Sequence, residues 1–268
     1  MVPGSTYRER LPPAALAGHV LCVWSQVIGP GERVRHHRVV PDGCADLVWI
    51  GRAPAVVAGP ATRPSVVPLA PETIVIGLRL HPGAVPCVLG LPAHELADRD
   101  TPLTDIWGAA AADLSDQVGE QALVADRQRQ AAAALTLRLA AARAPDPMIA
   151  AATSWLARHP AGRVATLARR LEVGERRLHR RFTAAVGYGP KTFQRVMRLQ
   201  RVLRLASRRP PSAASLAALA AAAGYADQAH MARELRALTG RTAGVLLAEA
   251  ASTLELSELF KTAPAAAA

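Results

Sequence analysis

The sequence predicts an α+β multidomain protein with a β-rich N-terminal domain of barrel or sandwich type, a helical connector and an all-α C-terminal domain with two helix-turn-helix units. Three observations lead to this fold class. Short apolar runs separated by Gly and Pro fill residues 7–89, good helix formers dominate from residue 103 onward, and the excess positive charge lies in the last third. The predicted domains are 1–102, 103–144 and 145–250, followed by a tail at 251–268.

The N-terminal domain is predicted to consist of short strands. Apolar runs occur at residues 19–27, 46–50, 55–58 and 73–80, and they are separated by segments such as Pro41-Asp42-Gly43. Because Gly and Pro interrupt helices and favour turns, this pattern is typical of β-structure.

The connector begins where the apolar spacing changes. Leu103, Ile106 and Trp107 follow a helical period, and residues 117–143 are a long run of good helix formers. Each proline in Pro145-Asp146-Pro147 disfavours helix at the residue before it, so we expect the domain boundary there.

The C-terminal domain is predicted to contain six helices with short connections. They lie at residues 148–158, 164–171, 174–186, 190–207, 215–223 and 227–238. Tight turns at 172–174 and 224–226 divide four of these helices into two helix-turn-helix units. In the second helix of each unit an apolar pair spaced i, i+4 can lock the two helices together, namely Leu178 with Phe182 and Met231 with Leu235.

Charge is concentrated in this domain. Residues 158–241 carry 18 Lys and Arg against 4 Asp and Glu, a net charge of +14, whereas the rest of the chain sums to −3. A compact basic segment attracts polyanions, so nucleic acid is the expected partner and an anionic membrane surface is the alternative.

Composition excludes several other classes of protein. Cys22, Cys44 and Cys87 are odd in number and form no CxxC pair, so we expect buried thiols in a reducing compartment. No stretch approaches the roughly 20 apolar residues that span a bilayer. These observations predict a cytoplasmic protein without a membrane segment, and no motif calls for a cofactor.

The residues that face outward on the second helix of each unit have the chemistry of base and phosphate contacts. Arg binds guanine or phosphate, Gln binds adenine, and a helix fits the major groove. Asp227 is a suitable N-cap for the second of these helices, and Gly224 suits the left-handed residue that ends the helix before it.

The C-terminal domain resembles the DNA-binding domain of the AraC/XylS family of bacterial regulators. The strings that carry the resemblance are LARRLEVGERRLHRRFTAAVGYGPKTFQRVMRLQRVL and LAALAAAAGYADQAHMARELRALTGRTAGVLL. In that family one rigid helix joins the two units, which here corresponds to residues 190–205, about 24 Å at 1.5 Å per residue. The sequence departs from the family at Gly174, where Ser or Thr is usual, at Leu235, where an aromatic residue is usual, and near Thr242, where a proline is missing.

The resemblance implies specific DNA contacts. The base-reading positions fall on Arg176, His179, Arg180, Gln228, His230 and Arg233. The candidates for phosphate contact are Arg177, Arg181, Lys191 and Arg195. The partner is expected to be double-stranded DNA, with RNA polymerase as a further partner.

The N-terminal domain resembles a cupin-like domain that precedes this DNA-binding domain in many regulators. The matching stretches include VVPDGCADLVW, GLRLHPGAVPCVLG and LTDIWG. This architecture implies control by a small-molecule effector or by formation of a homodimer.

Other functions remain as alternatives. A cupin-type metal-binding enzyme or sensor fused to a DNA-binding module would need a set of ligands, but His36 and His37 are adjacent and point to opposite faces of a strand. Together with His81 and Glu72 they fall short of a two-histidine, one-carboxylate site, so we predict no enzyme and no metal. A nonspecific nucleic-acid binder and a pure interaction module also remain open.

Overall fold

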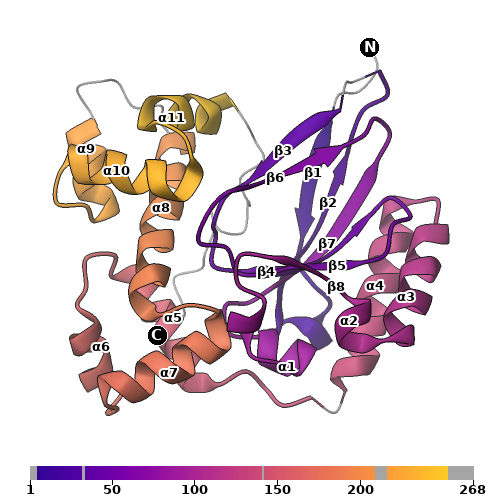
Figure 1. Cartoon of the computed structure of the whole chain (residues 1–268), viewed down its shortest axis with the longest axis horizontal. Coiled ribbons are helices and arrows are strands. Elements are labelled where there is room, and N and C mark those ends of the chain that lie inside the picture. Colours follow the sequence, from indigo (N-terminus) through magenta and orange to yellow (C-terminus); the bar gives the residue numbers. More distant parts are fainter. Residues whose placement is uncertain (1–4, 32–33, 141, 209–215, 253–268) are drawn as a thin grey trace.

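The computed structural model describes residues 5–31, 34–140, 142–208 and 216–252 (Figure 1). Its strands lie in the N-terminal part, as predicted. They are β1 (Thr6–Arg10), β2 (Val20–Val27), β3 (Arg35–Val39), β4 (Ala45–Ile50), β5 (Val56–Ala58), β6 (Ser65–Leu69), β7 (Ile74–Leu80) and β8 (Asp100–Pro102). The four predicted apolar runs correspond to β2, β4, β5 and β7, which confirms a β-rich N-terminal domain.

Six strands form one antiparallel sheet in the order β1-β2-β7-β4-β5-β8. The remaining two, β3 and β6, pair with each other and form a separate ribbon, called the β3–β6 ribbon below. Successive residues along a strand point to opposite faces of the sheet. The six-stranded sheet therefore has two faces with different coverings.

Helices cover one face of the six-stranded sheet (Figure 1). Leu47, Trp49 and Leu78 point to this face and are fully or almost fully buried. The helices that enclose them are α1 (Val85–Leu89), α3 (Ala109–Glu120) and α4 (Val124–Leu139). The short elements η1 (Ala14–Leu16), η2 (Ala93–Glu95) and α2 (Thr104–Trp107) connect these parts. The predicted connector is thus helical, and its helices complete the core of the sheet.

Arg127 fixes the break between α3 and α4. Residues 117–143 were predicted to be helical, and the structure divides this stretch between two helices, because α3 ends at Glu120 and α4 begins at Val124. The buried guanidinium of Arg127 donates hydrogen bonds to the carbonyl oxygens of Gln121 (2.7 Å), Gly51 (2.6 Å) and Gly119 (3.1 Å). A cation at the end of a helix satisfies carbonyls that have no helical partner. The turn between α3 and α4 keeps both helices packed on the sheet. The helix propensity of the residues in this stretch does not predict such a turn.

Two of the three cysteines are buried as predicted. Cys22 and Cys44 lie in the interior, whereas Cys87 is only half-buried. Cys87 is on α1, whose buried residues are Val85, Val88 and Leu89. The core-facing side of this short helix is therefore occupied by other residues, and the prediction that Cys87 is buried is wrong.

The C-terminal part consists of helices. They are α5 (Pro147–Arg158), α6 (Val164–Arg170), α7 (Glu175–Val186), α8 (Pro190–Arg208), α9 (Leu216–Ala223), α10 (Gln228–Thr239) and α11 (Ala243–Ser252). The first six were predicted, although Ser215 and the tail beyond residue 252 lie outside the described residues. The additional helix α11 packs on α8 through Leu246 and Leu247. None of the described helices is both long and apolar enough to cross a membrane.

Residues 40–44 of the N-terminal domain dock on α8. The side-chain amide of Gln200 donates a hydrogen bond of 2.7 Å to the buried carbonyl of Pro41, and Val40 packs against the C-terminal core. Gly43 has a φ of +91°, and a Cβ there would lie 2.9 Å from Phe193 Cε2. Only glycine permits both this backbone conformation and this close approach. The N-terminal domain thus contacts the helix that joins the two helix-turn-helix units.

Candidate nucleic-acid interface

The first helix-turn-helix unit consists of α6 and α7. Leu167 on α6 and Leu178 and Phe182 on α7 are buried, as the i, i+4 spacing predicts. Phe182 also meets Phe193 of α8 edge to face, with ring centroids 5.5 Å apart. Gly174 is the N-cap of α7 and provides no side-chain cap. Packing rather than capping therefore holds α7 in place.

The outward face of α7 is basic and open to solvent. Arg176, Arg177, His179 and Arg180 are all exposed. His179 leans toward the start of α8, because a Cβ on Gly189 would lie 2.6 Å from His179 Nε2. Three arginines in two turns of one exposed helix can contact phosphate oxygens and the acceptors of guanine.

Arg181 differs from these arginines because it has an internal partner. Its Nη2 atom lies 2.5 Å from Asp146 Oδ2, and the other carboxylate oxygen of Asp146 caps α5 by accepting from the amide of Met148 at 3.0 Å. Arg181 therefore ties α7 to the start of α5.

The second unit consists of α9 and α10 and has stronger local signals. Asp227 is the N-cap of α10, and its carboxylate accepts from the amide of His230 at 2.6 Å. Gly224 follows α9 with a φ of +88°, and a Cβ there would lie 2.9 Å from Pro160. Met231 and Leu235 are fully buried. The prediction of an N-cap and a left-handed glycine at this turn is confirmed.

The predicted DNA contacts on α10 fall into two groups. Gln228 and Arg233 are exposed, as is Arg236 one turn further on. His230 is half-buried, its Nε2 atom lies 3.4 Å from Glu234 Oε1, and its ring meets Tyr225 edge to face. The outward face of α10 therefore presents Gln228 and Arg233, whereas His230 lies within an internal network.

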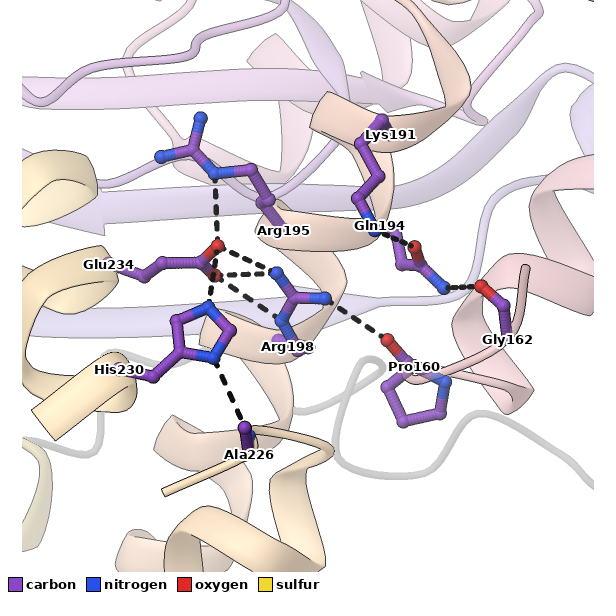
Figure 2. A network of polar contacts seen from close by, with 9 residues as sticks. All are labelled: Pro160, Gly162, Lys191, Gln194, Arg195, Arg198, Ala226, His230 and Glu234. Carbon is purple, nitrogen blue, oxygen red and sulfur yellow. Dashed lines mark hydrogen bonds and ion pairs between the residues drawn. The ribbon is translucent and has the colours of Figure 1, made fainter. Parts of the chain in front are cut away.

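Glu234 is the centre of this network, which Figure 2 shows. Its carboxylate accepts two hydrogen bonds of 2.7 Å from Nη2 of Arg198 and lies 3.3 Å from Nε of Arg195. Burial would raise the pKa of Glu234, but the hydrogen bond and charge of Arg198 and the charge of Arg195 outweigh burial and lower it below its ordinary range. Glu234 is therefore an anion that joins α10 to α8.

The same side of α8 also binds the segment between α5 and α6 (Figure 2). Arg198 donates from Nη1 to the carbonyl of Pro160 at 3.2 Å, and Gln194 donates to the carbonyls of His159 (3.0 Å) and Gly162 (2.8 Å). These carbonyls belong to the segment between α5 and α6. One polar face of α8 thus binds both α10 and the segment that leads into α6.

The sequence did not reveal this role of Arg198, Gln194 and Glu234. Arg195 and Lys191 were predicted to contact phosphate. The guanidinium of Arg195 lies beside Glu234, and Lys191 is exposed with Nζ 3.5 Å from Gln194 Oε1. The available signal was an acidic residue in a strongly basic domain, but 36 positions separate Arg198 from Glu234.

α8 sets the separation of the two units. It has 19 residues, so it is about 28 Å long, somewhat longer than expected from the sequence. In Figure 1 it runs from the α6–α7 unit below to the α9–α10 unit above. A length of this order suits two helices that enter major grooves roughly 34 Å apart.

The candidate metal ligands of the N-terminal domain do not assemble. His36 is exposed and His37 half-buried on β3. Among the described residues, no group of three or more His, Cys, Asp or Glu side chains is arranged to hold a metal ion.

Comparison with known proteins assigns both ends of the chain to families. Residues 8–102 match a domain of unknown function, DUF6597, and residues 167–249 match a helix-turn-helix domain of the AraC type. No curated protein matches the chain. Similar solved structures include an apo point variant of ToxT from Vibrio cholerae, with a TM-score of 0.44 and 10% identity over 84% of this chain and 96% of that chain. A second structure of ToxT from Vibrio cholerae has a TM-score of 0.44 and 9% identity over 91% of this chain and 98% of that chain.

The helix-turn-helix match agrees with the geometry described above, in which two exposed helices with basic side chains lie at the ends of one spacer helix. The chain carries a DUF6597 domain before a helix-turn-helix domain of the AraC type, and this composition supports a DNA-binding transcription regulator.

Proposed function

We propose that this regulator reads a bipartite DNA site sequence-specifically, with α7 and α10 in neighbouring major grooves on one face of the duplex. The observation that carries the proposal is the exposure of Arg180 on α7 and Arg233 on α10, while the buried sides of both helices pack on the same spacer helix. This arrangement leaves two basic helix faces available at once. Phosphate contacts supply affinity, and contacts with base edges supply sequence choice.

The proposed base-reading residues are Arg176, Arg180, Gln228 and Arg233. All four are exposed, and Arg and Gln match the hydrogen-bonding edges of guanine and adenine. His179 is exposed as well and is proposed as a weaker contact beside Arg180. Arg177 and Lys191, which are exposed near the same surface, are the proposed phosphate contacts.

Three residues that the family resemblance placed at the DNA have internal partners. Arg181 pairs with Asp146, whereas Arg195 and His230 both lie beside Glu234. A side chain that already holds a partner must release it before it binds DNA. We therefore propose that these residues mainly position α7 and α10.

The N-terminal domain is proposed to control DNA binding, through a small-molecule effector or through self-association. Support comes from the docking of residues 40–44 on α8, where Pro41 meets Gln200. Any shift of this loop acts on the helix that spaces the two DNA-reading units. Because its partner is DNA, we propose that the protein acts in the cytoplasm as a one-component regulator together with RNA polymerase.

Selection of bound duplexes from a random pool by the full-length protein tests the proposal. The expected product is a motif with two blocks about one helical turn apart, 10 to 10.5 base pairs. Enrichment of no motif would identify a nonspecific binder, and absence of binding at moderate salt would identify an interaction module. Either result would contradict sequence-specific reading.

A further inference from the structure

A cavity of about 640 Å³ lies between the six-stranded sheet and the β3–β6 ribbon. Val48, Ile50 and Val75 line it from the sheet, and Val67 and Leu69 line it from the ribbon. At one end the C-terminal domain contributes Gln200 and Leu203 of α8. The cavity is large enough for a small organic molecule and has an apolar floor.

One part of the cavity wall combines carboxylates with aromatic rings. Asp42, Asp46, Trp24 and Tyr7 all line the cavity. The indole of Trp24 lies against Gly77, where a Cβ would come within 2.2 Å of the ring, and its Nε1 atom donates to Asp46 Oδ1 at 2.6 Å. The rings of Tyr7 and Trp24 have centroids 6.0 Å apart. Aromatic faces beside carboxylates attract organic cations.

The charges at this wall do not cancel locally. The Nε atom of Arg79 lies 3.4 Å from Asp42 and 3.2 Å from Asp46, so one guanidinium serves two carboxylates. Burial and the charge of Asp46 raise the pKa of Asp42 against the opposing effect of Arg79. A second positive group at this wall would relieve that excess of negative charge.

Gln26 provides an independent sign of a missing partner. It lies on β2 two residues after Trp24, on the same face of the strand, and it lines the cavity. It is only 2% exposed, and its Nε2 atom has no hydrogen-bond partner among the described residues. Buried amide donors are normally satisfied, so a polar group of a bound molecule would remove an energetic cost here.

We propose that this cavity binds a small organic amine with an apolar tail, and this proposal builds on the effector control proposed above. The ammonium group lies between Asp42, Asp46 and the face of Trp24, and the tail lies along Val48, Ile50 and Val75. An oxygen next to the ammonium group accepts the hydrogen bond of Gln26. Because Asp42 belongs to the loop that docks on α8, the bound amine is adjacent to the contact between Pro41 and Gln200.

Isothermal titration of the full-length protein with three eight-carbon probes tests the charge preference. Octylamine is protonated at pH 7, octan-1-ol is neutral and octanoate is an anion. We expect octylamine to bind about tenfold more tightly than octan-1-ol, with octanoate weakest. Tighter binding of octanoate, equal binding of octylamine and octan-1-ol, or no binding of any probe would each overturn the proposal.

Variants then locate the site. Asp46→Asn keeps the shape and the acceptor for Trp24 and should reduce octylamine affinity about tenfold while octan-1-ol binding stays unchanged. The matched control is Asp100→Asn, because Asp100 is an exposed carboxylate at the edge of the cavity. This variant should change the affinity for neither octylamine nor octan-1-ol. Thermal melting checks folding, and Asp42→Asn replaces Asp46→Asn if the latter unfolds. Unchanged octylamine affinity in the folded variant would contradict the assigned wall.

A fourth probe tests Gln26. The amino alcohol 2-aminooctan-1-ol should bind more tightly than octylamine to the unmodified protein, and Gln26→Leu should abolish that difference. A difference that persists in Gln26→Leu would remove Gln26 from the site. All titrations are done without DNA and the duplex selection is done without amine, so failure of the amine site and failure of DNA reading are distinguished.

Discussion

Arg198 on α8 and Glu234 on α10 form a buried ion pair in which Nη2 lies 2.7 Å from both carboxylate oxygens. The side chain of Arg198 is 5% exposed and that of Glu234 is 13% exposed. Since Arg198 also binds the carbonyl of Pro160, one side chain connects α10 to the segment that leads into the first helix-turn-helix unit. Arg198 therefore holds α10 against α8 and against the segment before α6.

The first prediction concerns this pair. Glu234→Gln leaves the buried guanidinium without a counter-charge, so the free energy of unfolding should fall by about 3 kcal/mol. Chemical denaturation measures the change. Arg129→Gln, which removes an exposed ion pair with Asp126 on α4, should cost less than about 1 kcal/mol. Similar losses of unfolding free energy in the two variants would mean that the buried pair stabilises the fold no more than the exposed pair does.

The pH dependence of the same pair gives a second prediction. The folded protein lowers the pKa of Glu234 below its unperturbed value of 4.5, so the carboxylate stabilises the fold above that pH. This stabilisation is lost as the pH falls through 4.5 and below it, because the unfolded chain then binds the proton more readily. The difference in unfolding free energy between the unmodified protein and Glu234→Gln should therefore shrink between pH 6 and pH 3. A constant difference would contradict the shifted pKa.

The third prediction separates two adjacent arginines of α7. Arg180→Ala should cost about 1–3 kcal/mol on the selected site and much less on random DNA, because an exposed base contact is lost. Arg181→Ala removes the same charge from a residue that is paired with Asp146 and should leave base preference unchanged. Binding is measured by fluorescence anisotropy with both duplexes. Equal losses on the two duplexes for Arg180→Ala would assign that residue to phosphate.

Phosphate contact predicts a different pattern for Arg177. Arg177→Ala should weaken binding to specific and random duplexes by the same factor and should reduce the slope of log affinity against log salt by about 1. Titrations at four salt concentrations measure this slope. A change in the preferred sequence with no change in slope would assign Arg177 to a base instead.

The last prediction concerns the docking of the N-terminal domain. Gln200→Leu removes the donor for the buried Pro41 carbonyl, which should cost about 1–3 kcal/mol. Hydrogen exchange should then increase in residues 40–44 and at the middle of α8. The exposed Gln228→Leu on α10 is the control and should leave this exchange unchanged. Unaltered exchange in Gln200→Leu would show that other contacts maintain the docking.

Several elements could be predicted because their signals are local. The turn at Gly224 and the N-cap at Asp227 follow from the backbone conformation of single residues, and the buried pair of Leu178 and Phe182 follows from helical periodicity. The exposed positions of Arg176, Arg180, Gln228 and Arg233 follow from the same periodicity. The break between α3 and α4 could not be predicted in this way, because it depends on contacts of Arg127 with Gly51, which is 76 positions away.

The sequence by itself determined two helix-turn-helix units, a basic C-terminal domain and an N-terminal β-domain, because caps, periodicity and charge act within a few residues or add up over a segment. Only the tertiary structure decided that Arg195 and His230 lie beside Glu234, that residues 40–44 dock on α8, and that Asp42, Asp46 and Trp24 share a cavity wall. The physical reason is that a charged side chain has many possible partners in the sequence. Packing of distant elements selects which of them comes within hydrogen-bonding distance.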